Sequence, residues 1–330
     1  MIRYRKLKSN QMRNPKLSFV IPARDEEQSV EKLVVEILSS LKNVSKSFEI
    51  IFVDDGSTDK TYLKLKKLRR HDKRIKVIRL RGSFGKSVAL QVGFDHAKKD
   101  IIFTMDADLQ DNPKEIPNFL KKLGEGYDLV SGWKKNRHDP HLKKVIPSRI
   151  INFLTRLLTG VPIHDTNCGF KVYRRVVIES LNLYGELYRF IPVIAYRQNF
   201  RVGEIEILHR KRLYGQTKFG WERGIKGILD LLTITFLTGF IRRPGHFFGS
   251  IGIGSFFIGF LIGFYIAYLR FTTGSIQARH PLLFLGMLLM IIGVQLISTG
   301  LLAEMIVYSK GKLDYTSAIK ESLGIRGRQN

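Results

Sequence analysis

Two long apolar segments lie near the end of the chain. Residues 247–269 and residues 281–303 each contain no Asp, Glu, Lys or Arg. As helices, segments of this length extend about 34 Å, enough to cross a hydrocarbon core about 30 Å thick. Buried core helices are the alternative, but charged residues near the ends of both segments favour membrane spans: Arg243, Arg270, Arg279 and Glu304. The pattern therefore predicts a transmembrane hairpin over residues 244–308.

The charges beside this hairpin predict its orientation. The connecting segment, residues 270–280, is short, so we expect antiparallel spans whose outer ends face the same side. Basic residues flank that side: Arg223, Lys226, Arg242, Arg243, Lys310 and Lys312. Because cytoplasmic flanks of membrane spans carry an excess of Lys and Arg, we expect the rest of the chain in the cytoplasm, including a tail at residues 309–330. Residues 1–16 form a basic, polar arm without the apolar core of a signal peptide.

An amphipathic segment precedes the first span. Apolar residues recur there at helical spacing, interrupted by Lys226 and Asp230: Ile225, Ile228, Leu229, Leu232 and Phe236. The segment is too short and too charged to cross a membrane, so residues 221–243 are predicted to lie at the interface. A core helix of the soluble domain is the alternative.

The first part of the chain alternates between short apolar runs and amphipathic segments. Strands are predicted at residues 17–21, 48–53, 75–78, 100–105 and 127–130. Helices are predicted between them at residues 29–41, 58–70, 86–98 and 113–123. This alternation is typical of an α/β fold in which helices cover both faces of a mainly parallel sheet, here within residues 17–220. Ligands of such sheets bind at the carboxyl ends of the strands.

Acidic turns follow three of the predicted strands, at residues 22–27, 54–59 and 106–111. In the last turn Asp106 and Asp108 point the same way from an extended segment, and Gln110 continues that face. Such hard oxygen ligands suit Mg²⁺ or Mn²⁺ shared with substrate phosphates. The alternative is an acidic turn in which Asp111 and Asn112 cap the next helix.

The middle turn has two interpretations as well. Asp55 is placed to hydrogen-bond a nucleobase or a ribose, whereas Ser57, Thr58 or Asp59 would cap the following helix. The sequence contains neither G-x-G-x-x-G after the first strand nor G-x-x-x-x-G-K-[ST] anywhere. Dinucleotide oxidoreductases and P-loop enzymes are therefore disfavoured.

Composition narrows the range of partners. A net charge of +26 indicates a polyanion, which could be nucleic acid, an anionic membrane surface or a phosphorylated substrate. The hydrophobic content of 44% excludes a disordered chain. A single cysteine, Cys168, excludes an internal disulfide framework and a cysteine-cluster metal site, and it fits a reducing compartment.

The turns belong to an ordered set of motifs. Val20–Glu27, Val53–Asp59, Ser83–Lys86 and Asp106–Gln110 resemble those of family 2 glycosyltransferases with the GT-A fold. Within that class the chain resembles the polyprenyl-phosphate glycosyltransferases, relatives of dolichol-phosphate mannose synthase and of bacterial glucosyl carrier-lipid synthases with C-terminal membrane hairpins. Two later segments share the resemblance, which extends from about residue 17 to residue 308: Leu213–Lys218 and Gly293–Ser298.

This resemblance implies transfer of one sugar from a UDP- or GDP-sugar to a polyprenyl phosphate such as undecaprenyl or dolichyl phosphate. The reaction would be a metal-dependent, inverting single displacement at the cytoplasmic membrane face. A phosphate nucleophile is already ionised near neutral pH, so no Ser-His-Asp apparatus is required. Catalysis would consist mostly of positioning and of charge stabilisation on the departing nucleoside diphosphate.

The resemblance also implies roles for individual residues. Asp108 and Gln110 would hold Mg²⁺ or Mn²⁺, with Asp106 and Ala107 on the nucleotide side of the turn. The remaining donor-binding residues would be Pro22, Arg24, Glu26, Val53, Asp55, Lys86, Arg212 and Lys218. Lys134 and Arg149 are candidates for the acceptor phosphate, and Asp165 matches an acidic position near the sugar. The sequence differs from the family in having Arg24-Asp25 where Tyr-Asn is frequent, which leaves base recognition open.

For two of these residues, Lys134 and Asp165, a purely structural role is the alternative. Lys134 begins a basic stretch, residues 134–144, that could be a solvated loop facing the membrane. Asp165 could form an Asx-turn. The glycines of the spans would permit close contact between helices of different copies, so a homo-oligomer is a further hypothesis: Gly252, Gly259, Gly263 and Gly286.

Two other functions remain as alternatives. A processive polysaccharide synthase would share the fold and the metal turn, but that class usually carries Gln-x-x-Arg-Trp and more spans. A membrane-anchored nucleic-acid binder would use the positive charge, yet it would need basic and aromatic residues on one platform away from the acidic turns. We therefore expect a nucleotide sugar, a lipid phosphate and a membrane as partners, and no nucleic acid.

Overall fold

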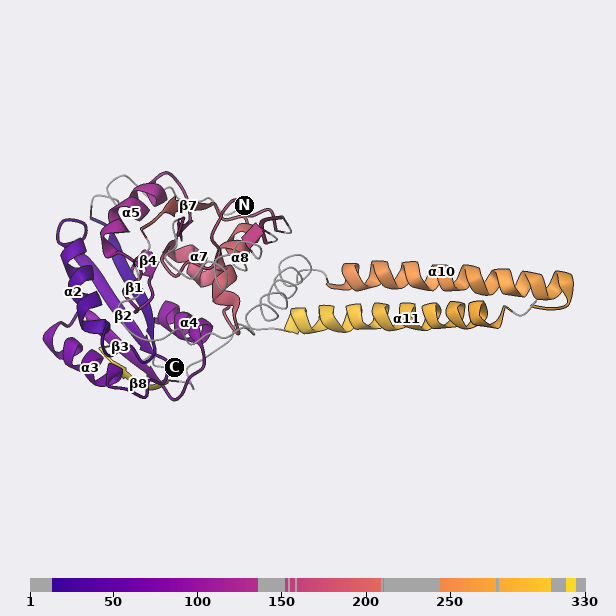
Figure 1. Ribbon diagram of the computed structural model, residues 1–330, viewed down its shortest axis with the longest axis horizontal. Coiled ribbons are helices and arrows are strands. Elements are labelled where there is room, and N and C mark those ends of the chain that lie inside the picture. The colour runs from indigo at the N-terminus through magenta and orange to yellow at the C-terminus, as the bar shows by residue number, and fades with distance from the viewer. Residues whose placement is uncertain are drawn as a thin grey trace. The chain divides into compact units, whose positions relative to one another are not determined.

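A computed structural model describes residues 14–135, 152–153, 155–157, 159–208, 210, 244–276, 279–309 and 319–324. The chain divides into two compact units. One comprises residues 1–234 together with residues 313–330, and the other comprises residues 235–312. Figure 1 shows the first unit as a sheet with helices and the second as a pair of long helices.

The first unit is built on one sheet, whose described strands follow the order β7-β5-β6-β4-β1-β2-β3-β8. β1 pairs in parallel with β2 and β4, β2 with β3, and β5 with β7, whereas β6 and β8 are antiparallel to their neighbours. The prediction of a mainly parallel sheet is thereby confirmed. The strands are β1 (Lys16–Ala23), β2 (Ser47–Asp54), β3 (Ile75–Leu80), β4 (Ile101–Thr104), β5 (Leu129–Trp133), β6 (Lys171–Arg174), β7 (Val202–Glu206) and β8 (Ile319–Leu323).

Helices cross between the strands as the amphipathic pattern predicts, and they end within a few residues of the predicted positions. The first four are α2 (Val30–Leu41), α3 (Thr61–His71), α4 (Lys86–His96) and α5 (Ile116–Gly124), the last preceded by the 3₁₀ turn η1 (Pro113–Glu115). Later elements were not predicted: α7 (Arg175–Ser180), the 3₁₀ turn η3 (Leu187–Phe190) and α8 (Ile191–Arg197). These are short, so they present little periodicity to recognise.

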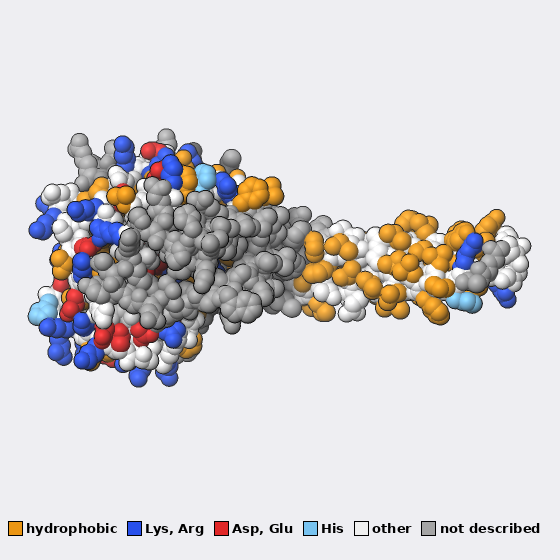
Figure 2. Space-filling model, viewed as in Figure 1, with side chains coloured by type: hydrophobic (Ala, Val, Ile, Leu, Met, Phe, Trp, Pro, Cys, Tyr) orange, Lys and Arg blue, Asp and Glu red, His pale blue; other side chains and the backbone are white. Residues whose placement is uncertain are grey.

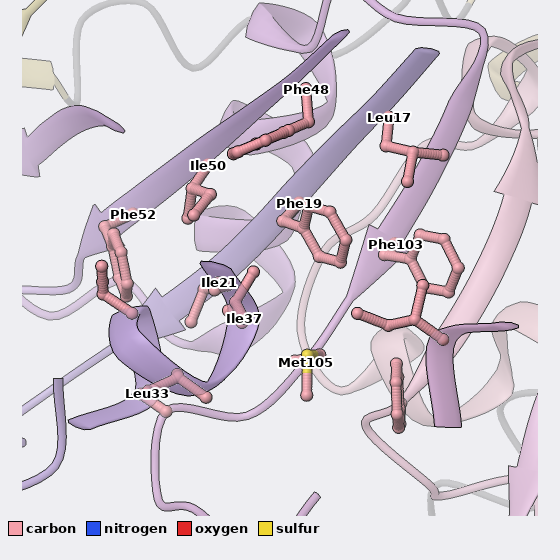
Figure 3. Close-up of a cluster of buried hydrophobic side chains, with 14 of the residues drawn as sticks. Leu17, Phe19, Ile21, Leu33, Ile37, Phe48, Ile50, Phe52, Phe103 and Met105 are labelled. Carbon is pink, nitrogen blue, oxygen red and sulfur yellow. The ribbon is translucent and has the colours of Figure 1, made fainter. Parts of the chain in front are cut away.

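The apolar core fixes the strand ends that carry the acidic turns. Phe19 of β1 stacks on Phe103 of β4, with ring centroids 5.1 Å apart. Leu33 and Ile37 of α2 are fully buried in the same cluster, which Figure 3 shows against β1 and β2. Each buried side chain of this size contributes roughly 1.5–3 kcal/mol, so β1 and β4 are held rigidly side by side.

The strand β8 is formed by part of the segment that was predicted to be a tail, residues 309–330. Residues 319–323 pair antiparallel with β3 and complete that edge of the sheet. Glu321 of β8 approaches Lys66 at 4.0 Å. Burial, with the negative charge of Glu321 nearby, raises the pKa of Tyr62 to about 12. The chain after the hairpin therefore belongs to the same unit as the chain before it.

A chain that ends at residue 318 should be less stable than one that ends at residue 324. Loss of β8 removes ladder hydrogen bonds worth about 0.5–1.5 kcal/mol each. It also exposes the edge of β3, which invites aggregation. Thermal melting of both truncated chains in detergent measures the difference, and we expect the shorter chain to melt several degrees lower. Equal melting temperatures would show that β8 adds nothing to the fold.

The second unit is a helical hairpin, α10 (Pro244–Thr273) and α11 (His280–Ser309). Both helices are long and apolar enough to cross a membrane, in agreement with the two predicted spans. Figure 2 shows many hydrophobic side chains on their visible surface, and many of the large ones are exposed.

The hairpin uses three of the four glycines that suggested an oligomer. A Cβ atom on Gly252 would lie 2.7 Å from the Gly293 carbonyl oxygen, and one on Gly259 would lie 2.5 Å from that of Gly286. These glycines therefore let α10 and α11 approach each other closely within one chain. Gly263 has no neighbour within 4 Å of its Cβ position. Oligomerisation through the spans stays a prediction.

Candidate active site

The three acidic turns lie at the same edge of the sheet. β1 lies between β2 and β4 and is parallel to both, so the carboxyl ends of all three strands meet there. The turns after β1 and β2 are joined by hydrogen bonds. The Asp25 backbone N–H donates to Ser57 Oγ at 3.0 Å, and the Thr58 N–H donates to Asp25 Oδ1 at 2.8 Å. Asp25 adopts a φ of 53°, a left-handed conformation that these contacts hold in place.

Asp55 organises the loop that leads into α4. Its buried carboxylate accepts hydrogen bonds from the Phe84 N–H at 2.7 Å and from the Gly85 N–H at 3.1 Å. Arg24 donates to Ser83 Oγ in the same loop at 2.6 Å. These contacts place Lys86, the first residue of α4, against the acidic turn that follows β4. The predicted contact of Asp55 with a base or ribose stays a prediction.

Other predicted donor-site residues have structural partners or positions in the packing. The Glu26 carboxylate accepts from Ser29 Oγ at 2.6 Å, next to the start of α2. Val53 is fully buried, and Pro22 lines a pocket beneath the site. Asp59 Oδ1 accepts from the Thr61 N–H at 2.9 Å and so satisfies a backbone amide at the start of α3, although the N-cap position itself is Lys60.

The turn after β4 carries the densest set of charges. Asp106 pairs with the Lys86 ammonium. Asp108 is buried, and its Oδ1 accepts from the Gln110 N–H at 3.1 Å. Leu109, between Asp108 and Gln110, adopts a φ of 63°, which produces the sharp reversal of this turn.

Asn112 and Asp111, at the end of this turn, differ in whether they cap the next helical turn. Asn112 accepts from the Lys114 N–H at 3.2 Å and so caps η1, as the capping interpretation predicted. Asp111 does not cap. It is fully buried and forms an ion pair with Lys134 at 2.9 Å. The side chain of Lys134 is only 11% exposed, so the interpretation of Lys134 as a solvated loop residue is wrong.

The local electrostatics keep this site ionised. Burial raises the pKa of the Asp106 carboxyl, but the ammonium groups of Lys86, Lys134 and Lys171 outweigh it and hold that pKa below its usual value. Burial lowers the pKa of Lys86 and of Lys134, but Asp106 and Asp111 raise both pKa values above normal. Lys171 behaves differently, because burial lowers its pKa to about 8.

The loop that contains Asp165 lies beside the ends of β5 and β6. Asp165 Oδ1 accepts from the Asn167 N–H at 3.1 Å, so the Asx-turn is present. Ser131 of β5 donates to the Asp165 carbonyl oxygen at 3.4 Å. Burial raises the pKa of the Cys168 thiol to about 12, which leaves it protonated and unreactive. The role of Asp165 near a sugar stays a prediction.

A pocket beneath Asp106 was not predicted from the sequence. It is lined by residues of β1, α4, β4, β6, η3 and α8 and of the segments next to β4 and β6: Pro22, Lys86, Leu90, Thr104, Met105, Asp106, Gly169, Lys171, Tyr173, Tyr188 and Ile191. Lys86 lies over the Tyr188 ring, 5.0 Å from its centroid. The only sequence signal for Lys171 is a lysine at the start of a short apolar strand. Tyr188 has no such signal.

The oxygen ligands of the acidic turn fit a hard divalent cation only in part. Within the described ranges, no group of three or more His, Cys, Asp or Glu side chains converges as a metal site. One or two carboxylates with substrate phosphates are the usual protein contribution to a Mg²⁺ site. Asp108 and Gln110 are therefore compatible with a cation whose remaining ligands come from a diphosphate. Arg149, Arg212, Lys218, residues 221–243 and most of the basic arm lie outside the described residues.

Replacing Gly169 with alanine should displace Asp106. A Cβ atom at this position would lie 2.5 Å from Asp106 Oδ2, closer than any stable contact. Because the Asp106–Lys86 pair depends on that position, we expect kcat/KM for sugar transfer to fall about 100-fold. Gly82→Ala is the matched control, since nothing lies within 4 Å of its Cβ position. Equal activity of the two variants would contradict a functional role for Asp106.

Comparison with known proteins gives relatives for almost the whole chain. The family described as glycosyl transferase family 2 matches residues 18–181. The dodecaprenyl-phosphate galacturonate synthase of Rhizobium johnstonii is 40% identical over 88% of this chain and 87% of its own. The undecaprenyl-phosphate 4-deoxy-4-formamido-L-arabinose transferase of Proteus mirabilis is 33% identical over 94% of this chain and 95% of its own.

Solved structures share the fold. The crystal structure of glucosyl-3-phosphoglycerate synthase from Mycobacterium tuberculosis, in complex with Mn²⁺, UDP-glucose and phosphoglyceric acid, has a TM-score of 0.52 at 19% identity. The match covers 66% of this chain and 80% of that one. Together with the acidic turns and the apolar hairpin, these relationships show that the chain belongs to glycosyl transferase family 2 and is a glycosyltransferase related over most of its length to polyprenyl-phosphate sugar synthases and transferases.

Proposed function

We propose that this protein transfers a single sugar from a UDP- or GDP-sugar to the phosphate of a polyprenyl phosphate at the cytoplasmic face of a membrane. The observation that carries the proposal is the 40% identity to a dodecaprenyl-phosphate galacturonate synthase over 88% of the chain. A match of 294 residues is too long to be confined to the first unit, so it includes part of the apolar hairpin as well. A lipid acceptor requires a site beside the bilayer, and a membrane hairpin anchors the chain there.

The acidic turn is proposed to hold Mg²⁺ or Mn²⁺ through Asp108 and Gln110. When bound, the cation would neutralise charge on the diphosphate of the donor. Asp106, fixed by Lys86, would face the nucleoside side of the turn. Pro22, Arg24 and Asp55 line or organise the neighbouring strand ends, where the nucleoside is proposed to lie.

The acceptor phosphate needs cationic side chains but no general base, because it is ionised at neutral pH. Arg149 is the proposed contact for that phosphate, and Arg212 and Lys218 are proposed to close over the diphosphate. Lys134 is proposed to act through its charge on the acidic turn, since its ammonium pairs with Asp111. A single displacement at such a site inverts the anomeric centre.

The proposed orientation is supported by the connectivity and the charges. β8 and β3 share one sheet, which supports an even number of membrane crossings between them. Basic residues flank the outer ends of both spans, among them Arg242, Arg243, Lys310 and Lys312. We therefore place the catalytic unit and both termini in the cytoplasm.

The test is an assay of the purified protein with labelled donors, undecaprenyl or dolichyl phosphate, and Mg²⁺ or Mn²⁺. The panel contains UDP-galacturonate and UDP-4-deoxy-4-formamido-L-arabinose, because relatives are named for these sugars. It also contains UDP-glucose and GDP-mannose. We expect one donor to give a lipid-linked monosaccharide. A polymer would indicate the processive alternative, and the absence of any lipid-linked product would contradict the proposal.

A further inference from the structure

Lys171 is a buried cation beneath the acidic turn. It is the first residue of β6 and lies opposite Thr104, the last residue of β4, in the antiparallel pair. Its relative exposure is 3%. Directly opposed residues of an antiparallel pair point to the same face of a sheet, so Lys171 shares a face with Thr104. That face lines the pocket below Asp106.

Lys171 forms no salt bridge with a carboxylate of the described residues, although its charge helps to lower the pKa of Asp106. Its ammonium donates one hydrogen bond, to the Cys168 carbonyl oxygen. Lys86 and Lys134, by contrast, each form an ion pair with an aspartate of the turn. An ammonium group has three donors, and burying one without an opposite charge is unfavourable. The unfavourable burial of Lys171 is reflected in its lowered pKa.

The surroundings of Lys171 are suited to an anion. Lys86 lies on the wall of the same pocket at the start of α4, where the helix dipole adds positive potential. Tyr173 and Tyr188 line the pocket as well and carry hydroxyl groups. Among the described residues, the one carboxylate that lines the pocket belongs to Asp106, which is paired with Lys86 and is proposed to face the nucleoside. A buried cation beside a substrate site is a frequent mark of function.

We propose that Lys171 binds a negatively charged oxygen of the donor substrate. The inference rests on the proposed function, since it requires a nucleotide-sugar donor at this edge of the sheet. Two groups of the donor have the required chemistry: the diphosphate, which every donor carries, and the carboxylate of a uronic acid such as galacturonate. Either group would form the direct ion pair that Lys171 does not make with any described residue.

A purely structural role for Lys171 predicts different behaviour. If its ammonium served only to brace the Cys168 carbonyl, replacing it would lower the stability of the protein without donor. If it serves the donor, Lys171→Met should fold as well as the wild type, because methionine has a similar length and removes an unpaired buried charge. The melting temperature without ligand should then stay within a few degrees or rise.

The experiment measures binding by calorimetry of the full chain in detergent with Mn²⁺. The ligands are UDP, UDP-galactose and UDP-galacturonate, of which the last two differ only in the carboxylate. We expect Lys171→Met to weaken binding at least about 10-fold, and Lys171→Arg to retain most of it. Lys121→Met, at an exposed position of α5, is the control and should bind like the wild type. If the wild type binds GDP and not UDP, the ligands are instead GDP and the corresponding GDP-sugars.

The pattern of losses identifies the group that Lys171 contacts. Equal weakening for all three ligands assigns the diphosphate, and weakening for UDP-galacturonate alone assigns the carboxylate. Unchanged binding of every ligand overturns the inference. A Lys171→Met protein that fails to fold, or that melts many degrees lower without ligand, overturns it too. A wild-type protein that binds no nucleotide of either series contradicts the proposed function itself.

Discussion

An Asp108→Asn variant is expected to transfer sugar at least about 1,000-fold more slowly than the wild type. Asparagine keeps the oxygen that accepts from the Gln110 N–H, so the turn retains its shape. It removes the negative charge with which Asp108 is proposed to hold Mg²⁺ or Mn²⁺. Loss of charge stabilisation on a departing diphosphate removes the main contribution that such a site makes to the rate.

The measurement is the initial rate of lipid-linked sugar formation over a titration of Mn²⁺ at saturating donor. The variant should also require more Mn²⁺, while its melting temperature without metal stays close to that of the wild type. Glu125→Gln, at an exposed position of the first unit, is the matched control. Transfer by the Asp108 variant at a rate within a few-fold of the control would rule out Asp108 as the metal ligand.

An Asp111→Asn variant is expected to lose about 3–5 kcal/mol of stability. Asp111 is fully buried and pairs with Lys134, whose side chain is 11% exposed. Removing one partner leaves a buried ammonium without an opposite charge, which is far more costly than removing both. Asparagine retains an oxygen that can accept from the Asp106 N–H, so the effect reports mainly on the charge.

A double-mutant cycle separates the ion pair from the rest of the site. The Lys134→Met variant should also be destabilised, whereas the double variant should lose much less than the sum of the two single losses. Thermal melting of the four proteins in detergent gives the comparison, and the single variants should melt roughly 10 °C lower. If the two single losses of stability sum to the loss of the double variant, Asp111 and Lys134 do not stabilise each other.

Elements that alternate regularly along the first part of the chain were predictable from the sequence, whereas β6, β7 and β8 were not. The strands β1 to β5 and the helices α2 to α5 follow apolar runs and amphipathic patterns that local sequence displays directly. β6 has four residues, and β8 is a charged five-residue segment that follows the hairpin. Their formation depends on pairing with strands that are distant in sequence, which no local pattern records.

The residues of the candidate site also divide into those that the sequence predicted and those that it did not. Asp106, Asp108 and Asp55 were predicted because each lies in a turn that follows a strand, and parallel strands bring such turns together. The pairing of Lys134 with Asp111 and the position of Lys171 were not predicted. They depend on how β5 and β6 join the sheet beside β4, with β6 antiparallel to both.

The sequence by itself determined the α/β class, the apolar hairpin, the order of the acidic turns and the resemblance to polyprenyl-phosphate glycosyltransferases. All of these follow from local periodicity and from motifs read along the chain. The tertiary structure decided which charges neutralise one another, because burial and distance exist only once distant strands have paired. It alone shows that Lys86 and Lys134 are matched by carboxylates and that the described residues leave Lys171 without one.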